Sequence, residues 1–327
     1  MRIGIIGAGL VGSKRAKAIG DHQLLAVADI NESRARELAA AHRCRWTKDW
    51  KDVVADDSID LVIVSTTNDW LAPITIEAIK NGKHVLVEKP AARNPPELQK
   101  VIEVAKKHPE LKVKVGFNHR FHPAIQKAKE IFESGRFGRL MYIRGRYGHG
   151  GRKGYEKEWR AKPEIAGGGE MLDQGIHLVD LCRWFGGDFD VAMGYCATMF
   201  WDMEVEDNCF ALLKNKRGAV AWLHASWTEW KNLFSFEIFC ERGKLEINGL
   251  GGSYGEETLT CYKMRPEFGV PDKEVFSWKG EDVSWRKELE HFVAAIEKKK
   301  PISGTLEDAA AAMKLIFDIY RWSKKQG

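Results

Sequence analysis

The sequence predicts an α/β protein with a doubly wound parallel sheet in its N-terminal part and a largely antiparallel, open sheet in a C-terminal α+β part. Two observations predict this. Short apolar runs alternate with helical patterns over roughly the first 120 residues, which is typical of parallel sheets. Beyond about residue 200, apolar runs follow one another with only short turns between them. We therefore expect two domains, residues 1–120 and 121–327, with a last helix at 305–322 that packs back toward the first domain.

Composition narrows the class of protein. With 44% apolar and 30% charged residues the chain is of ordinary globular type. Its net charge of +5 is small for 327 residues, so we expect no nucleic-acid partner. The six cysteines form no CxxC pair and no Cys/His cluster, which predicts reduced thiols and no metal site. No run reaches membrane-spanning length and a strand begins at residue 2, so we expect a cytoplasmic protein with no membrane partner.

A glycine-rich turn follows the first apolar run, at residues 2–6. Gly7 permits the tight turn, Gly9 lets backbone amides approach a pyrophosphate, and Gly12 lets the next helix pack closely. The N-terminus of that helix, expected at 13–19, supplies a positive field for the phosphates. The strand–turn–helix context makes this GxGxxG pattern a dinucleotide-binding turn.

The second strand, expected at 24–28, ends at Asp29, about twenty residues after Gly9. An acid at this interval binds the adenosine ribose and repels a 2′-phosphate. The sequence therefore favours NAD over NADP, although the nearby Arg34 keeps this preference moderate.

Further strands of the parallel sheet are expected at 61–65, 84–87 and 113–117, with helices at 33–41, 49–55, 74–80 and 96–107. The carboxyl ends of parallel strands form the crevice in which ligands bind. The expected cofactor-binding residues lie at these ends: Gly7, Gly9, Leu10, Val11, Gly12, Asp29, Ser65, Thr66, Thr67, Asn68, Glu88, Lys89 and Asn118.

The run 82–90, GKHVLVEKP, places a lysine at one of these strand ends. His84 begins a short apolar strand between turn signals, and Glu88, Lys89 and Pro90 follow it. Because Lys89 precedes proline, its backbone is biased toward an extended conformation. Most single lysines face solvent, whereas this one is predicted to face the ligand crevice.

A helix expected at 168–185 is the second candidate for chemistry. Its apolar residues predict a core-facing side, while Asp173, His177 and Asp180 form a polar stripe in which Asp173 and His177 are four residues apart. An acid beside a histidine stabilises the charged imidazole and holds its ring. The alternative is a solvent-exposed ion pair. The glycines at 167–169 suggest a backbone approached closely by a ligand or by the other domain.

The remaining elements predict the second domain. Helices are expected at 123–134 and 285–298, and strands at 140–147, 209–213, 218–227, 234–240 and 244–247. Hairpin turns are expected at 215–218 and 242–243.

The motifs GAGLVG, GKHVLVEKP, GFNHRF and GGGEMLDQGIH, in this order, resemble those of the Gfo/Idh/MocA oxidoreductases, the family of glucose–fructose oxidoreductase and inositol dehydrogenase. The resemblance covers about the first 185 residues. It implies that Lys89, Asp173 and His177 surround the reacting carbon of a sugar or polyol. It also implies a homodimer or homotetramer that uses the open face of the second sheet.

Hydride transfer from a secondary alcohol requires that a proton leave the oxygen. We assign His177 as the general base in oxidation and Lys89 as a hydrogen-bond donor to the same oxygen. Asp173 would orient the histidine or hold a hydroxyl of the substrate. The expected substrate-binding residues are polar or aromatic: Arg120, Tyr147, His149, Arg152, Tyr155, Trp159 and Arg160. The basic stretch 136–162 is suited to recognising a phosphate or carboxylate, with a solvated basic surface as the alternative. Its loop GHGGRKGYEKEWR resembles that of family members in sugar and nucleotide-sugar metabolism, which implies an anionic sugar.

Two other functions fit the same resemblance. An NAD-dependent glycosidase would oxidise its sugar transiently and then eliminate the aglycone. A ligand-sensing regulator would use the scaffold without catalysis, although the joint presence of Lys89, Asp173 and His177 argues against this.

Overall fold

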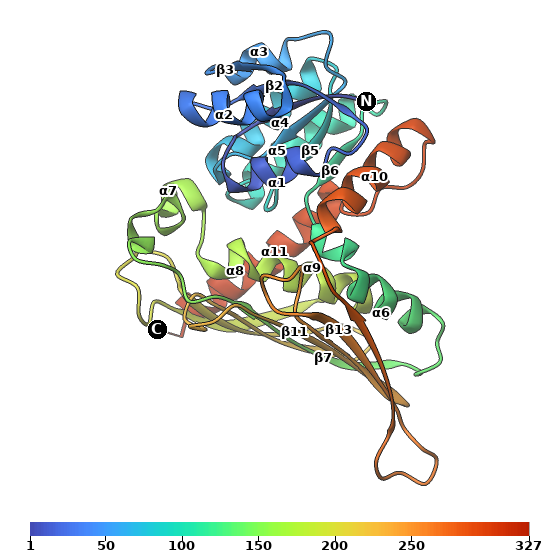
Figure 1. Ribbon diagram of the computed structural model, residues 1–327. Helices are drawn as coiled ribbons and strands as arrows, with labels where there is room; N and C mark the ends of the chain where they lie inside the picture. The colour runs from blue at the N-terminus through green and yellow to red at the C-terminus, as the bar shows by residue number, and fades with distance from the viewer. Residues whose placement is uncertain (327) are drawn as a thin grey trace. The chain divides into compact units, whose positions relative to one another are not determined.

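The computed structural model describes residues 1–326, which form two compact units (Figure 1). Unit 1 contains Met1–Phe117, Glu164–Gly167 and Trp285–Ala310. Unit 2 contains Asn118–Pro163, Gly168–Ser284 and the chain from Ala311 on. Each unit is thus assembled from separate stretches of the chain.

Unit 1 contains a six-stranded parallel sheet in the order β3-β2-β1-β4-β5-β6, which confirms the predicted doubly wound architecture. Right-handed crossovers place the helices that lead toward β3 and those that lead toward β6 on opposite faces. The strands are β1 (Arg2–Ile6), β2 (Gln23–Ala28), β3 (Arg45–Thr47), β4 (Leu61–Val64), β5 (His84–Val87) and β6 (Val113–Val115).

The helices of unit 1 are α1 (Leu10–Lys17), α2 (Glu32–His42), α3 (Trp50–Val54), α4 (Asn68–Lys80), α5 (Pro95–Lys107) and α10 (Ser284–Glu297). Two of them begin earlier than expected. Helix α1 begins at Leu10, directly after Gly9, and α4 begins at Asn68. The expected start of α4 at residue 74 is wrong because Pro73, normally a first-turn residue, lies inside the helix.

Helix α10 completes the core of unit 1. Its Leu289, Phe292 and Val293 belong to the same buried cluster as Ile3 and Ile5 of β1. Their burial removes apolar side chains from water, which is the main driving force for packing a distant segment onto the sheet. A segment nearly 300 residues along the chain is therefore part of the dinucleotide-binding unit.

A buried ionic network joins α1, β5, β6 and α10. Arg15 is 1% exposed and contacts Glu88 at 2.5 Å and Glu288 at 2.6 Å. Lys114 lies 3.2 Å from Glu288 and donates to the carbonyl of Ser303. Burial raises the pKa of Glu88, and the attraction of Arg15 opposes that effect.

Unit 2 is built on an eight-stranded sheet in the order β14-β13-β12-β11-β7-β10-β9-β8. All neighbouring pairs are antiparallel except β7 with β10, so the predicted antiparallel sheet is confirmed. Its strands are β7 (Leu140–Gly148), β8 (Val191–Ala197), β9 (Asn208–Lys214), β10 (Val220–Ser226), β11 (Leu233–Cys240), β12 (Gly243–Asn248), β13 (Glu257–Lys263) and β14 (Asp272–Trp278).

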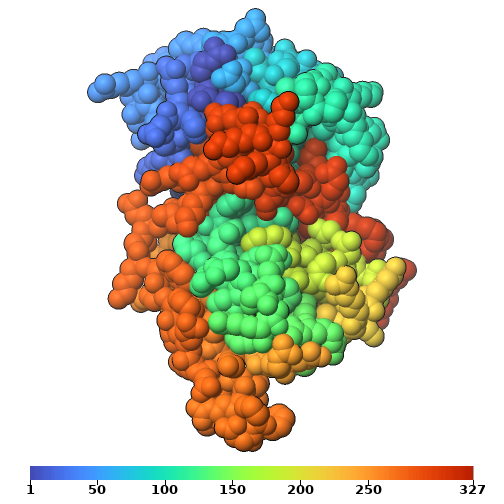
Figure 2. Space-filling view, turned by 90° about the vertical axis from the view of Figure 1, so that its right-hand side faces the viewer, coloured from blue at the N-terminus to red at the C-terminus, as the bar shows by residue number. Residues whose placement is uncertain are grey.

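The expected strands β7 and β9 to β12 are present, whereas β8, β13 and β14 were not expected. Strands β8 and β14 form the two edges of the sheet, and most residues of β14 are exposed, so they lack a buried apolar alternation. The β13–β14 turn projects from one end of the unit and carries the exposed Phe268 and Val270 (Figures 1 and 2).

The helices of unit 2 pack on one face of its sheet, with α9 against β7 and β10, and α6 against β12, β13 and β14 (Figure 1). They include α6 (Pro123–Glu133), α8 (Glu170–Asp173), α9 (Gly175–Gly186), and three 3₁₀ turns, η1 (Asn118–Phe121), η2 (Tyr155–Lys157) and η3 (Trp159–Ala161). Helix α7 (Pro163–Ala166) belongs to unit 1 from Glu164 on. The single helix expected at 168–185 is wrong, because Gln174 interrupts it.

Helix α11 (Leu306–Lys324) begins with the predicted capping box. Asp308 accepts a hydrogen bond from the Thr305 amide at 3.1 Å, and the Thr305 hydroxyl accepts one from the Asp308 amide at 3.1 Å. From Ala311 on, the helix belongs to unit 2, where Tyr320 and Ser323 bond to Glu206 and Cys196. Its residues up to Ala310 belong to unit 1, and the packing of the helix toward the first domain stays a prediction. None of the helices described in residues 1–326 combines the length and apolarity that crossing a bilayer requires.

We predict that Glu288→Ala destabilises unit 1 by about 3–5 kcal/mol, because it leaves Arg15 and Lys114 buried with one carboxylate fewer. Urea unfolding followed by circular dichroism measures the change. Glu290→Ala, at an exposed position of the same helix, is the control and should stay within about 0.5 kcal/mol. Equal effects of the two substitutions would contradict a stabilising network.

Candidate active site

The glycine turn between β1 and α1 leaves an open surface at Gly9. Gly7 has a φ of +98°, and a Cβ there would lie 2.4 Å from the carbonyl oxygen of Ser65. A Cβ at Gly12 would lie 1.9 Å from the carbonyl oxygen of Gly7. At Gly9, by contrast, a Cβ would meet nothing within 4 Å. Gly7 and Gly12 are thus required by the fold, and Gly9 exposes the backbone that a pyrophosphate needs.

Asp29 is held at the carboxyl end of β2, beside this turn. Its carboxylate accepts hydrogen bonds from the amides of Ala8 and Asn31, both at 2.7 Å. Leu10, at the start of α1, is 75% exposed, and Ile30 is 90% exposed. Both side chains are exposed close in sequence to Gly9 and Asp29, and the contact of Asp29 with a ribose hydroxyl stays a prediction.

The side chains that follow β4, which were predicted to bind the cofactor, form hydrogen bonds within the protein. The hydroxyl of Ser65 donates to the carbonyl of Gly7 at 2.8 Å, which ties the glycine turn to β4. Thr67 donates to Asp69 at 2.6 Å, while the hydroxyl of Thr66 donates to the Thr67 carbonyl at 3.1 Å. The amide of Asn68 donates to the carbonyl of Ala166 at 2.8 Å. The side chains of Ser65 and Asn68 therefore hold the fold around the turn.

Lys89 follows β5, whose bounds agree with the predicted strand. The side chain is partly buried, the Lys89–Pro90 peptide is cis, and the Ala91 amide closes a turn on the Glu88 carbonyl at 2.9 Å. Glu88 itself is committed to Arg15, so its carboxylate has a structural partner. Because this carboxylate is already paired, the predicted contact of Glu88 with the cofactor would be made by its backbone.

In unit 2, Asp173 and His177 lie on two different helices. Asp173 closes α8, and its carboxylate accepts a hydrogen bond from Arg160 Nε at 2.9 Å. His177 lies in the first turn of α9 and is 4% exposed. The premise that one continuous helix aligns the two side chains is therefore wrong. Arg160, which was expected to bind substrate, pairs with Asp173 within the protein, and its contact with substrate stays a prediction.

His119 is a site residue that the sequence did not reveal. Its ring stacks on that of His177, with centroids 3.7 Å apart and planes at 18°. Its Nδ1 lies 3.2 Å from Asn118 Oδ1, and the amide nitrogen of Asn118 donates to Ser284 at 2.9 Å. Asn118 thus has a structural role in unit 2, and its contact with the cofactor stays a prediction. The motif GFNHRF was recognised, but nothing local indicated that its histidine meets His177.

A tyrosine pair borders these rings. The ring of Tyr147 lies 5.1 Å from that of His119 and 5.1 Å from that of Tyr254. Gln174 donates to the hydroxyl of Tyr254 at 3.2 Å. Burial, followed by the neighbouring Tyr254, raises the pKa of Tyr147, so its phenol stays protonated. Tyr254 lies in a turn before β13 and carried no sequence signal.

Arg120 has a structural partner within unit 2. It is 4% exposed and forms a bidentate pair with Asp180, with Nε at 2.8 Å and Nη2 at 2.5 Å from the two carboxylate oxygens. Asp180 is fully buried. Asp180, predicted to belong to a polar stripe with Asp173 and His177, is thus a buried partner of Arg120, and a contact of Arg120 with substrate stays a prediction.

The loop after β7 holds the remaining predicted substrate residues. Tyr155 is 2% exposed and packs in a small core with Val205 and Trp227. Burial lowers the pKa of His149, whose Nδ1 accepts from the Gly151 amide at 2.9 Å. Trp159 lies under the guanidinium of Arg160, at 4.5 Å. Arg152 is mostly exposed and pairs with Glu158 at 2.7 Å.

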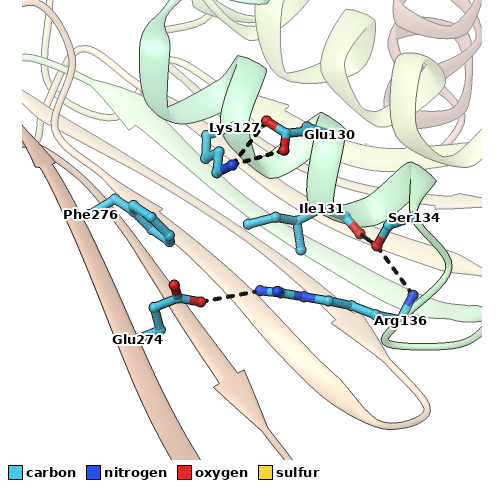
Figure 3. A pocket seen from close by; sticks show the side chains of 7 residues that line it. All are labelled: Lys127, Glu130, Ile131, Ser134, Arg136, Glu274 and Phe276. Carbon is cyan, nitrogen blue, oxygen red and sulfur yellow. Dashed lines mark hydrogen bonds and ion pairs between the residues drawn. The ribbon is translucent and has the colours of Figure 1, made fainter.

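A separate hollow of about 310 Å³ lies between α6 and β14 (Figure 3). Lys127 and Glu130 pair at 2.8 Å on its helical side, and Arg136 and Glu274 pair at 3.4 Å across it. It contains none of the predicted site residues. Its charges are balanced in pairs, so it has no single-sign field for an ionic ligand.

Two family models match this chain. One described as an oxidoreductase family with an NAD-binding Rossmann fold matches residues 1–117, and one described as a GFO/IDH/MocA C-terminal domain matches residues 125–246. The chain belongs to the GFO/IDH/MocA family. It is therefore an NAD-binding oxidoreductase, which confirms the family resemblance and the predicted cofactor.

Among curated relatives of this GFO/IDH/MocA protein, a levoglucosan dehydrogenase of Pseudarthrobacter phenanthrenivorans is 27% identical over 287 residues, 76% of this chain and 73% of the relative. A myo-inositol 2-dehydrogenase of Thermotoga maritima is 26% identical over 332 residues, 96% of this chain and 94% of the relative. A structure of levoglucosan dehydrogenase with NADH and levoglucosan superimposes with a TM-score of 0.90 at 23% identity, covering 100% of this chain and 98% of that one. At this identity the structure shows a shared fold.

We predict that Gly9→Ala lowers NAD affinity at least about tenfold, because its methyl group enters the space where the pyrophosphate approaches. The stability of the unliganded protein should change by less than about 0.5 kcal/mol. Gly12→Ala is the matched contrast and should destabilise the unliganded protein by about 1–3 kcal/mol, since its Cβ overlaps the Gly7 carbonyl. Calorimetric NAD titration and thermal unfolding measure the two effects. Wild-type NAD affinity in Gly9→Ala would refute the cofactor geometry.

Proposed function

We propose that this protein is an NAD-dependent dehydrogenase that oxidises a secondary alcohol of a neutral sugar or polyol. The observation that carries the proposal is His177, a buried imidazole stacked on His119 directly after the helix that ends at Asp173. The catalytic assignment of Lys89, Asp173 and His177 rests on this and on their place in the family motifs.

His177 is proposed to take the hydroxyl proton, since imidazole is the side chain best suited to general base catalysis near neutral pH. Stacking on His119 fixes the plane of its ring, which a base needs in order to meet the proton in line. Lys89 is proposed to donate a hydrogen bond to the same oxygen as negative charge develops there. Bound nicotinamide would supply the hydride acceptor.

The charges of unit 2 favour a neutral substrate over the anionic sugar considered from the sequence. Five of the six arginines between residues 136 and 160 are ion-paired within the protein, at 2.7–3.4 Å: Arg136, Arg139, Arg144, Arg152 and Arg160. Arg160, which is the most buried of them, would have to give up the Asp173 carboxylate to bind an anion, so its net gain from such a ligand is small. The dehydrogenases among the curated relatives are named for levoglucosan and inositol.

We predict that His177→Ala and Lys89→Ala each lower kcat by about 10²–10⁴-fold while NAD affinity is retained. The assay follows NADH formation from NAD with levoglucosan, inositols, other polyols, sugar acids and nucleotide sugars, with NADP in parallel. His224→Ala, another stacked imidazole of unit 2, and Lys80→Ala, an exposed lysine of unit 1, are the controls. A near-normal His177→Ala enzyme would refute the assignment. Release of an aglycone from an aryl glycoside without NADH accumulation would instead indicate a glycosidase.

We also propose that the open face of the unit 2 sheet binds a second copy of the chain. Trp222 is 40% exposed on this face, and its neighbours across the strands are Leu212 and Arg144. Tyr195, 53% exposed, continues the surface onto β8. An aromatic and aliphatic surface flanked by charges is typical of subunit interfaces.

We predict that Trp222→Glu shifts the protein to a smaller species in light scattering coupled to size-exclusion chromatography, because it places a charge in the apolar contact. Trp46→Glu is the control, since Trp46 is 38% exposed but lies in unit 1. A wild-type protein that is monomeric at all concentrations would refute the proposed interface.

A further inference from the structure

A loop between β8 and β9 binds the start of α8 with a single residue, Glu206. Its carboxylate accepts hydrogen bonds from the amides of Gly169 at 2.9 Å and Met171 at 3.1 Å. Its backbone carbonyl accepts one from the amide of Glu170 at 3.1 Å. Three successive backbone amides are therefore held by one residue that lies 35 or more positions along the chain.

Helix α8 depends on such a partner. It has four residues and begins after Gly169, which has no side chain that could cap it. Helix N-termini leave amides without intrahelical acceptors, and so short a helix is not stable by itself. The chain also passes from unit 1 to unit 2 between Gly167 and Gly168, just before this turn. Contacts with distant residues must therefore fix where α8 lies.

The three glycines that precede α8 are explained by protein contacts. A Cβ at Gly167 would lie 2.2 Å from the carbonyl oxygen of Arg93 in unit 1. A Cβ at Gly168 would lie 2.6 Å from the hydroxyl of Tyr320, and one at Gly169 would lie 2.0 Å from the carbonyl oxygen of Glu206. The close approach expected from the sequence is thus made by the protein itself.

Glu206 is in turn held rigidly. The hydroxyl of Tyr320, on α11, donates to its carboxylate at 2.6 Å. The neighbouring Asp207 accepts hydrogen bonds from the amides of Met199, Phe200 and Trp201 at 2.8–2.9 Å, which folds the loop onto itself. The carboxylate of Glu206 therefore presents a fixed set of acceptors to α8.

From this clamp, backbone hydrogen bonds lead directly to the proposed catalytic residues. The Asp173 amide bonds to the Gly169 carbonyl at 2.9 Å, and the Gln174 amide bonds to the Glu170 carbonyl at 2.9 Å. The His177 amide then bonds to the Gln174 carbonyl at 3.0 Å. A displacement of Gly169 or Glu170 would thus be passed on to both side chains.

We propose that Glu206 is a positioning residue for the reaction, which acts by clamping the first turn of α8 and thereby fixing Asp173 and His177. The inference rests on the proposed function for the roles of those two residues. Glu206 is proposed to act only through α8, without touching cofactor or substrate. Its effect on catalysis is a matter of geometry, to which reactions in enzymes are highly sensitive.

Two variants test the clamp. Glu206→Gln keeps the shape but turns an acceptor into an amino group that faces a backbone donor, and Tyr320→Phe removes one supporting hydrogen bond. Glu204→Gln, at an exposed position of the same loop, is the control. Hydrogen exchange of residues 169–173 should accelerate at least about tenfold in Glu206→Gln, less in Tyr320→Phe and not in the control, with β9 and β10 unchanged.

Steady-state kinetics separate positioning from general stability. With a substrate identified by the dehydrogenase screen, Glu206→Gln should lower kcat about 10–100-fold with KM and NAD affinity changed less than about threefold. Unchanged exchange at 169–173 would refute the clamp, and faster exchange with normal kcat would refute its role in catalysis. If Glu206→Gln does not fold, Tyr320→Phe decides on the same measurements. Because exchange needs no substrate, the clamp can be judged even if no dehydrogenase activity is found, an outcome that would refute the proposed function alone.

Discussion

Unit 1 depends on the buried charge pairs around Arg15. This side chain leaves α1 directly behind the glycine turn and contacts Glu88, the residue before Lys89. The same guanidinium reaches Glu288 on α10, and the indole of Trp285 lies 4.5 Å from it. A buried arginine without these partners would be very costly, so the glycine turn, the end of β5 and α10 are fixed together. The helix that receives the cofactor phosphates and the strand that presents Lys89 therefore cannot move independently of each other.

In unit 2, too, contacts between distant residues fix the candidate site, and many of these contacts are hydrogen bonds to backbone amides. Asp173 and His177 lie on either side of a helix break at Gln174, so they do not share one regular helix. Their orientation comes instead from Arg160, His119 and the loop that carries Glu206. Burial raises the pKa of Glu206, which is the electrostatic cost of placing a carboxylate where it binds three donors. Such a cost is typical of sites in which geometry matters more than stability.

The sequence predicted the elements whose signals are local. The strand at 84–87 has its predicted bounds because an apolar, β-branched run lies between a glycine turn and a proline. The capping box at Thr305 and the glycine turn at Gly7 are equally local. The edge strand β14 was missed because it is mostly exposed, and edge strands need no buried alternation. Sequence patterns thus predict those strands, turns and helix caps whose conformation depends on residues close by in the chain.

The candidate site was predicted less completely because distant residues decide its geometry. Helical periodicity paired Asp173 with His177, but the partners in space are Arg160, 13 residues away, and His119, on a different element. Arg120 was predicted to bind substrate and Asp180 to belong to a polar stripe, and the two side chains form an ion pair in the interior. Residue type alone cannot distinguish a buried pair from a ligand site, because both need the same charged groups.

The choice of cofactor can be argued further from the position of Asp29. Its two carboxylate oxygens accept amides from Ala8 and Asn31, so it cannot turn away to make room for a 2′-phosphate. Arg34, the nearest cation considered, lies on α2, where its amide is bound by the Asn31 side chain and its side chain is exposed. An exposed arginine is well screened by solvent, whereas the fixed acid stands at the ribose position itself. The repulsion of a phosphate by Asp29 therefore outweighs any attraction by Arg34, and the same hydrogen bonds that shape the glycine turn select NAD.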